Sequence, residues 1–175
     1  MNDVEWNIRR AQPDDASRLA EFGARTFHDS FGADNDAEDM RKHLASSFSA
    51  ARQLAEIRDP DIDTLICADG DTWQGFVQLR AGKVSDGVPS EGSIELWRFY
   101  VDKPWQGAGL ASALMHAAKR CARERGATTM WLGVWERNAR ALAFYRKHGF
   151  TVVGSQVFVV GNDPQTDHVM SCSLT

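Results

Sequence analysis

Long apolar runs and paired cysteines are both scarce in this chain of 175 residues. No apolar stretch approaches the roughly 20 residues that a membrane-spanning helix needs, and early charged residues argue against the apolar core of a secretion signal. The three cysteines Cys67, Cys121 and Cys172 are scattered among apolar neighbours. This pattern favours buried reduced thiols over a disulfide framework. We therefore expect a cytoplasmic protein that makes no contact with a membrane.

Positive charge is also limited, because 20 Lys and Arg face 24 Asp and Glu, for a net charge of −4. Without a strong basic run, this balance argues against a nucleic-acid partner. No His/Cys spacing typical of zinc occurs. A calcium loop starting at Asp34 fails because its sixth position is Asp39 instead of glycine. We expect no metal, and a single domain over residues 1–175 that is long enough to bury its own core.

Apolar periodicity and turn residues predict alternating strands and helices along the chain. The expected strands cover residues 4–9, 64–68, 73–80, 93–101, 129–134, 150–160 and 166–174. The expected helices cover residues 14–28, 36–47, 50–58 and 138–148, with one more that begins at Leu110. This order predicts an α/β (α+β) fold in which helices cover both faces of a mixed, mostly antiparallel sheet.

The segment between the strand at 93–101 and the next helix is the most informative part of the sequence. It reads Trp-Gln-Gly-Ala-Gly-Leu-Ala over residues 105–111, so little side-chain bulk covers its main chain. The first N–H groups of a helix lack internal partners, and the helix dipole adds partial positive charge there. Such a loop is suited to bind phosphate oxygens.

Two common phosphate loops do not fit this segment. A Walker loop needs Lys and Ser/Thr after its last glycine, whereas Gly109 is followed by Leu110 and Ala111. A dinucleotide fingerprint needs a third glycine where Ser112 stands. The spacing Gln106-x-x-Gly109-x-Ala111 instead resembles the pyrophosphate loop of the GCN5-related N-acetyltransferase (GNAT) superfamily, although a glycine-softened helix start is the plain alternative.

A second block, over residues 130–150, strengthens this resemblance. It is similar to the later GNAT signature, a strand followed by Asn-x-x-Ala-x-x-x-Tyr-x-x-x-Gly-Phe, and the matching positions run from Asn138 through Tyr145 to Phe150. The resemblance implies a sheet of six to seven strands with a splay between the fourth and fifth, and acetyl-CoA as cosubstrate. It further implies that the loop binds the pyrophosphate through Gln106, Gly107, Ala108, Gly109, Leu110 and Ala111.

The resemblance also implies roles near the reacting atoms. Main-chain N–H groups of Phe99, Tyr100 and Val101 would hold the acetyl carbonyl, Asn138 would bind the pantetheine arm, and Tyr145 would protonate the leaving sulfur. Asn138 and Tyr145 are two helical turns apart, so one extended ligand could touch both. Packing of Tyr145 as a core aromatic residue is the alternative.

Deprotonating the acceptor amine is the larger chemical problem, since neutralising an amine of pKa about 10.4 at pH 7 takes roughly 4.6 kcal/mol. In related polyamine acetyltransferases a glutamate often stands where this chain has Trp97. Glu95, one pleat away on the same strand face, could act as the base through a water. A structural ion pair of Glu95 with an arginine is equally compatible. His28 and Asp29 are further options.

The acceptor is the least determined part. Segments around residues 95–101, 131–136 and 161–167 look like bacterial spermidine/spermine acetyltransferases, apart from Trp97 and Ala108. An acidic stretch between Asp29 and Asp39 could attract a polycation, or could simply cap helices. We expect a small-molecule amine, with polyamines favoured over amino acids, aminoglycoside-like amines and protein N-termini. A non-catalytic CoA sensor is the rival class, and exposed final strands make a homodimer plausible.

Three basic residues of the helix after the loop, Lys119, Arg120 and Arg123, could meet the 3′-phosphate of CoA, or could form a charged outer face. His116 and His148 are expected on the surface.

Overall fold

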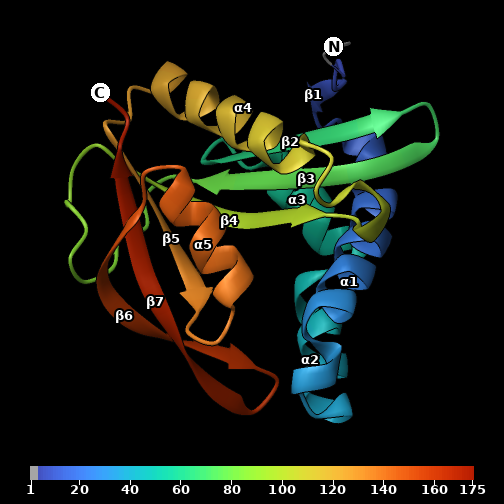
Figure 1. Cartoon of the computed structure of the whole chain (residues 1–175). Helices are drawn as coiled ribbons and strands as arrows, with labels where there is room; N and C mark the ends of the chain where they lie inside the picture. The colour runs from blue at the N-terminus through green and yellow to red at the C-terminus, as the bar shows by residue number, and fades with distance from the viewer. Residues whose placement is uncertain (1–3) are drawn as a thin grey trace.

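The computed structural model describes residues 4–175, and these form one seven-stranded sheet of order β1-β2-β3-β4-β5-β7-β6 (Figure 1). Its strands are β1 Ile8–Arg10, β2 Ile62–Asp69, β3 Thr72–Arg80, β4 Ser93–Val101, β5 Thr129–Trp135, β6 Thr151–Val160 and β7 Asp163–Ser173. All neighbouring strands pair antiparallel except β4 and β5, which are parallel. The expected mixed, mostly antiparallel sheet is therefore confirmed.

Five α-helices cover the two faces of this sheet: α1 Ala16–Phe31, α2 Ala37–Ser47, α3 Ala50–Arg58, α4 Leu110–Glu124 and α5 Ala139–Lys147. One buried cluster joins α4 and α5 to one face, around Leu110, Leu114 and Met130. A second cluster joins α1 and α2 to the opposite face, around Leu19, Phe27 and Phe76. Two apolar helical layers on one sheet give the chain two cores, one on each face.

Local sequence signals explain where the short helices begin. The Asp36 carboxylate accepts N–H groups of Glu38 and Asp39 at the start of α2, and the Ser49 hydroxyl accepts the Arg52 N–H at the start of α3. α1 differs from the expected 14–28, because a 3₁₀ turn occupies Pro13–Asp15 and the helix continues to Phe31. β7 begins three residues earlier than expected, since the strand pairing extends to the Gly161 turn of the β6–β7 hairpin.

The functional geometry comes from the way β4 and β5 separate. Their parallel pairing covers only Ser93–Glu95 against Thr129–Trp131, and beyond it the strands diverge (Figure 1). Pairing with β3 also skips Trp97, since Gln78 pairs with Arg98 while Leu79 pairs with Leu96. Such a bulge bends its strand and increases the local twist. The splay between the fourth and fifth strands is thus confirmed. Within residues 4–175, no helix has the length and apolar character to cross a membrane.

Candidate active site

A cavity of about 690 Å³ lies at the splay and is lined by residues from elements on both faces of the sheet. On the α4/α5 face it is lined by the loop after β4, the start of α4 and the inner side of α5, which we call the donor half. On the α1 face it is lined by α1, β6 and β7 together with aromatic residues of β4 and β5, which we call the acceptor half. Two ligands can therefore approach one another from opposite sides of the sheet.

The donor half begins with the predicted phosphate loop. Gly107 and Gly109 have φ of +79° and +94°, a left-handed conformation that favours glycine, and a Cβ at either would meet no atom within 4 Å. The first hydrogen bond of α4 runs from the Ala113 N–H to the Gly109 carbonyl at 3.1 Å. Three preceding N–H groups, those of Leu110, Ala111 and Ser112, have no main-chain acceptor among residues 4–175. The loop is thus a cradle of unpaired donors at a helix N-terminus, which suits a diphosphate.

Not every residue of the predicted loop lines this cavity. Gln106, Gly107, Gly109 and Ala111 do. The Leu110 side chain is fully buried in the core, and Ala108 points to solvent. Any contribution of these two residues to binding is therefore through the main chain.

Side chains around the cradle fix it and add positive charge. Gln106 donates to the Val101 carbonyl at 3.0 Å and accepts from Arg140 Nη1 at 2.6 Å, which ties the end of β4 to α5. Arg140, Lys103 and Lys147 line the donor half. In contrast, the half-buried Lys119 donates to the His148 carbonyl and Arg123 to the Leu174 carbonyl, and neither these two residues nor Arg120 lines the cavity.

His148 itself is half-buried, with Nε2 lying 3.2 Å from Ser112 Oγ, and its pKa is lowered by burial and by Lys119. It is therefore less exposed than the sequence suggested, whereas His116 lies on the surface as expected.

The edge of β4 that faces the splay presents main-chain donors. The Asp102 N–H binds the Gln74 carbonyl of the β3 side at 2.9 Å. Because N–H directions alternate along a strand, the N–H of Tyr100 also faces β3, while those of Phe99 and Val101 face the splay. The expected trio of carbonyl-binding donors therefore reduces to Phe99 and Val101. Tyr100 contributes its side chain instead, which contacts Phe27 on the α1 face.

Asn138 and Tyr145 both line the donor half, as the signature predicts. The Asn138 side-chain oxygen caps α5 by accepting the Ala141 N–H at 3.1 Å, which leaves its amide nitrogen for another acceptor. The Tyr145 ring packs between Phe99 and Phe150, with centroids 6.4 and 5.8 Å away. Burial, with a smaller contribution from Tyr100, raises the pKa of Tyr145 above its ordinary value of 10.0. The hydroxyl is therefore protonated at neutral pH and can act as an acid.

Glu95 does not reach the cavity. It is 5% exposed and lies where β4 and β5 are still paired. Its carboxylate receives Arg80 Nε at 2.7 Å. Burial raises the pKa of Glu95 while Arg80 opposes that change. Of the two alternatives considered for Glu95, a catalytic base and a structural ion pair with an arginine, the structure shows the ion pair.

The acidic stretch divides between one cavity residue and several structural ones. Asp29 lines the acceptor half and lies 3.7 Å from the guanidinium of Arg25. Asp36 caps α2, Glu38 pairs with Arg41 (2.6 Å), and Asp39 accepts the Asn162 N–H (2.9 Å). His28 is exposed and does not line the cavity.

Asp167 is the carboxylate that sequence reasoning missed as a site residue. It lies on β7, lines the acceptor half and is only 6% exposed. Burial, and then the charge of Glu136, raise the pKa of Asp167 to about 6 from its ordinary value of 3.8. The alternation of polar residues in β7 does not predict that Asp167 lines a cavity. That depends on where β4 and β5 separate, which the local sequence does not reveal.

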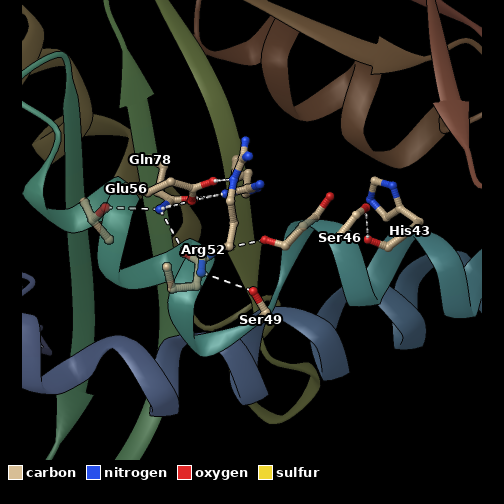
Figure 2. Close-up of polar contacts among 10 residues, drawn as sticks. His43, Ser46, Ser49, Arg52, Glu56 and Gln78 are labelled. Atoms are coloured by element: carbon tan, nitrogen blue, oxygen red, sulfur yellow. Dashed lines mark hydrogen bonds and ion pairs between the residues drawn. The ribbon is translucent and has the colours of Figure 1, made fainter.

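A buried polar network joins β4 to β3 and to α3 (Figure 2). Arg98 donates to Glu56 at 2.6 Å and to Gln78 at 2.7 Å, and Arg52 also donates to Glu56 at 2.7 Å. The Arg98 guanidinium stacks on the bulged Trp97, 3.8 Å from the ring centroid. Trp97 lines the cavity. A fully paired network of this kind holds the bulge, and therefore the cavity wall, in one conformation.

A splayed sheet with main-chain donors at its opened edge, next to a helix-start cradle for a diphosphate, defines an enzyme that binds a nucleotide-linked acyl group. The chain belongs to the acetyltransferase (GNAT) family, whose model matches residues 25–150. It is an N-acetyltransferase that uses acetyl-CoA.

Individual relatives agree with this assignment. An uncharacterized N-acetyltransferase from the pepI 3′ region of Lactobacillus delbrueckii subsp. lactis is 34% identical over 160 residues, covering 89% of this chain and 92% of that protein. The aminoglycoside N(6′)-acetyltransferase type 1 of Stenotrophomonas maltophilia is 31% identical over 147 residues, covering 82% and 84%. PaiA N-acetyltransferase of Thermoplasma acidophilum, solved with coenzyme A, shares the fold with a TM-score of 0.77 at 20% identity, over 97% and 99% of the two chains.

Proposed function

We propose that this enzyme acetylates a primary amine of a small polycationic molecule, with an aliphatic polyamine of the spermidine/spermine type as the favoured acceptor. The carrying observation is the chemistry of the acceptor half. It is lined by the carboxylates Asp29 and Asp167 and by the aromatic residues Phe27, Phe31, Trp97, Tyr100, Trp135 and Phe158. A third cavity carboxylate, Asp102, is paired with Arg25 of α1 at 2.8 Å. No Lys or Arg of α1, β4, β5, β6 or β7 lines it. Carboxylates attract ammonium groups, and aromatic faces bind both cations and methylene chains.

Aminoglycoside-like amines are the second candidate acceptor. They are also polycationic, and a relative that is 31% identical carries the name aminoglycoside N(6′)-acetyltransferase. Polar side chains at the rim, including Ser30, Asn35 and Gln165, could bind sugar hydroxyls. A polyamine has no hydroxyl groups, so the two acceptors make different use of this rim.

The proposed reaction is direct attack of the neutral amine on the thioester. The N–H groups of Phe99 and Val101 stabilise the oxyanion that forms on the carbonyl oxygen. The Tyr145 hydroxyl protonates the departing sulfur, and a base acting through a water removes the proton of the ammonium. Asn138 orients the pantetheine arm, and the cradle at 106–111 binds the diphosphate.

The test is continuous detection of the CoA thiol released from acetyl-CoA with a panel of amines. Spermidine, spermine and their acetylated forms, kanamycin-type aminoglycosides, free amino acids and an N-terminal peptide would each be offered over a concentration series. The proposal expects the highest kcat/KM with a polyamine. Saturable CoA binding without thiol release from any amine would contradict it and support a CoA sensor.

We also propose that the enzyme is a homodimer and that it is located in the cytoplasm. Val157 and Val159 on the edge strand β6 are 68% and 51% exposed, which supports a homodimer through this edge. The mass measured in solution by light scattering tests it. Cys67, Cys121 and Cys172 are free and buried, which is compatible with the reducing cytoplasm.

A further inference from the structure

Asp167 lies on the acceptor side of the sheet. The neighbours of Gly133 on β5, Leu132 and Val134, belong to the core on the α4/α5 face, so Gly133 opens to the other face. Gly133 lines the cavity, and a Cβ on it would meet Gln156 Nε2 first and then Asp167 Oδ2 at 3.1 Å. The carboxylate of Asp167 and the amide of Gln156 therefore both lie over this glycine, on the side from which the amine must enter.

Asp167 faces Tyr100 across the splay. The Tyr100 ring contacts Phe27 of α1 and Phe76 of β3, with centroids 6.2 and 5.5 Å away, which places its side chain on the same acceptor face. The charge of Asp167 contributes to the raised pKa of Tyr100. Tyr100 in turn contributes to the raised pKa of Tyr145, on the donor side. A carboxylate and a protonated tyrosine hydroxyl thus lie on opposite sides of the splay, where the acyl group is transferred.

The Asp167 carboxylate also lacks the partners that would make it structural. Among residues 4–175, burial and the charge of Glu136 are what act on its pKa, and no protein donor does. The nearest polar side chain is Gln156, its pairing partner on β6, whose Nε2 also lies over Gly133. Glu95, in contrast, is neutralised by Arg80, and Asp29 lies near Arg25. Within residues 4–175 no fully buried side-chain oxygen lacks a partner, so the oxygens of Asp167 reach the cavity that this residue lines. A ligand or water in the cavity can therefore donate to them.

We propose that Asp167 is the general base that takes the proton from the acceptor ammonium, a role that rests on the amine acetylation proposed above. The bound R–NH₃⁺ transfers one proton to the Asp167 carboxylate. The nitrogen lone pair then forms the C–N bond as the carbonyl π electrons move to oxygen. When the carbonyl re-forms, the C–S bond breaks and sulfur leaves with the Tyr145 proton. The nitrogen gives its second proton through water to the tyrosinate, and Asp167 then releases its proton to water. The products are the amide, free thiol and one proton released to water.

The charged and titratable groups around Asp167 suit this role. Glu136, which follows β5, and Tyr100 on β4 are its titratable neighbours. Asp29 of α1 lines the same cavity half, and the charge of Arg98 acts on Tyr100. No lysine or arginine among them contacts the carboxylate. With a pKa of about 6, Asp167 is ionised at neutral pH and is a stronger base than an exposed aspartate.

The experiment uses full-length enzyme and the best amine of the panel, with kcat/KM measured from pH 5 to 9. Wild type should lose activity below pH of about 6 as Asp167 becomes protonated. Asp167→Asn should remove that acid limb and lower kcat/KM at pH 7 by about 10²–10⁴-fold, with CoA affinity by calorimetry unchanged. Asp29→Asn is the matched control from the same cavity half: it should raise KM for a polycation and keep the limb.

A second readout separates base catalysis from structure. Trifluoroethylamine is largely neutral at pH 7, so Asp167→Asn should lose far less activity with it than with a polyamine. An Asp167→Asn enzyme that keeps the acid limb, or that loses activity equally with both amines, overturns the assignment. If the wild-type enzyme acetylates no amine, the proposed function is wrong, and so is the assignment of a base. If the wild-type enzyme is active but the pH profile of Asp167→Asn keeps its acid limb, only the assignment of Asp167 as the base is wrong.

Discussion

Replacing Gly109 by alanine tests the diphosphate cradle through backbone conformation alone. Gly109 has a φ of +94° and a Cβ there would meet no atom within 4 Å, so the substitution introduces no clash. An L-residue in the left-handed region costs about 1–2 kcal/mol. If this strain is relieved by moving the loop, the binding-competent conformation becomes about 5–30-fold less populated, and the apparent Kd for CoA rises by the same factor.

The chain provides a matched control at the other end of the same helix. Gly126 follows α4, has a φ of +80° and is equally unobstructed, but it does not line the cavity. Gly126→Ala should therefore lower the melting temperature by about as much as Gly109→Ala does, but it should leave the Kd for CoA unchanged. Isothermal titration with CoA and thermal unfolding of both variants give the comparison.

Two results would refute this reasoning. One is a Gly109→Ala enzyme that binds CoA as tightly as wild type, since the cradle would then not depend on the glycine conformation. The other is an equal loss of CoA affinity in Gly126→Ala, since the effect would then be general destabilisation of α4.

Three other substitutions give distinct outcomes. Tyr145→Phe should lower kcat by about 10²–10⁴-fold with little change in Kd for CoA, and a variant with the parental rate would remove Tyr145 from the mechanism. Glu95→Gln should destabilise the fold by about 1–3 kcal/mol, because Arg80 loses its partner, while kcat/KM at 25 °C stays near wild type; a lost acid limb would return Glu95 to the catalytic site. Asp167→Asn should be more stable than wild type at pH 7.5 by at most about 3 kcal/mol, judged by denaturant unfolding. The folded pKa of Asp167, about 6, lies above the ordinary 3.8, so wild-type stability falls as pH rises between these values and the difference between the enzymes disappears near pH 4.

Much of the fold was predictable because its signals are local. The α3 helix spans Ala50–Arg58 and β4 spans Ser93–Val101, as expected, the latter from a run of β-branched and aromatic residues. The cradle was predictable for the same reason, since Gly107 and Gly109 determine the backbone there. Boundaries at the ends of α1 and β7 depended on tertiary pairing and shifted by up to three residues.

The acceptor half was much harder to predict because it is assembled from distant segments. Glu95 and Asp167 both lie in strands, and nothing local distinguishes them. The pairing of β4 with β5 ends at Glu95, which buries that carboxylate against Arg80. Asp167 is paired with Trp135 and Gln156 in the half of the sheet that has diverged, so its side chain borders the opening. The difference between the two carboxylates is set by where the splay begins.

This arrangement also predicts the kinetic order of the reaction. The donor and acceptor halves are lined by elements on opposite faces of the sheet and form one cavity, so both substrates can be bound at once. No cysteine or histidine is among the described residues that line the cavity, and all three thiols are buried elsewhere, so no side chain of these types is placed to carry the acetyl group. Initial-rate lines at several fixed amine concentrations should therefore intersect, as expected for a ternary complex. Parallel lines would indicate an acetyl-enzyme intermediate and would contradict direct attack of the amine.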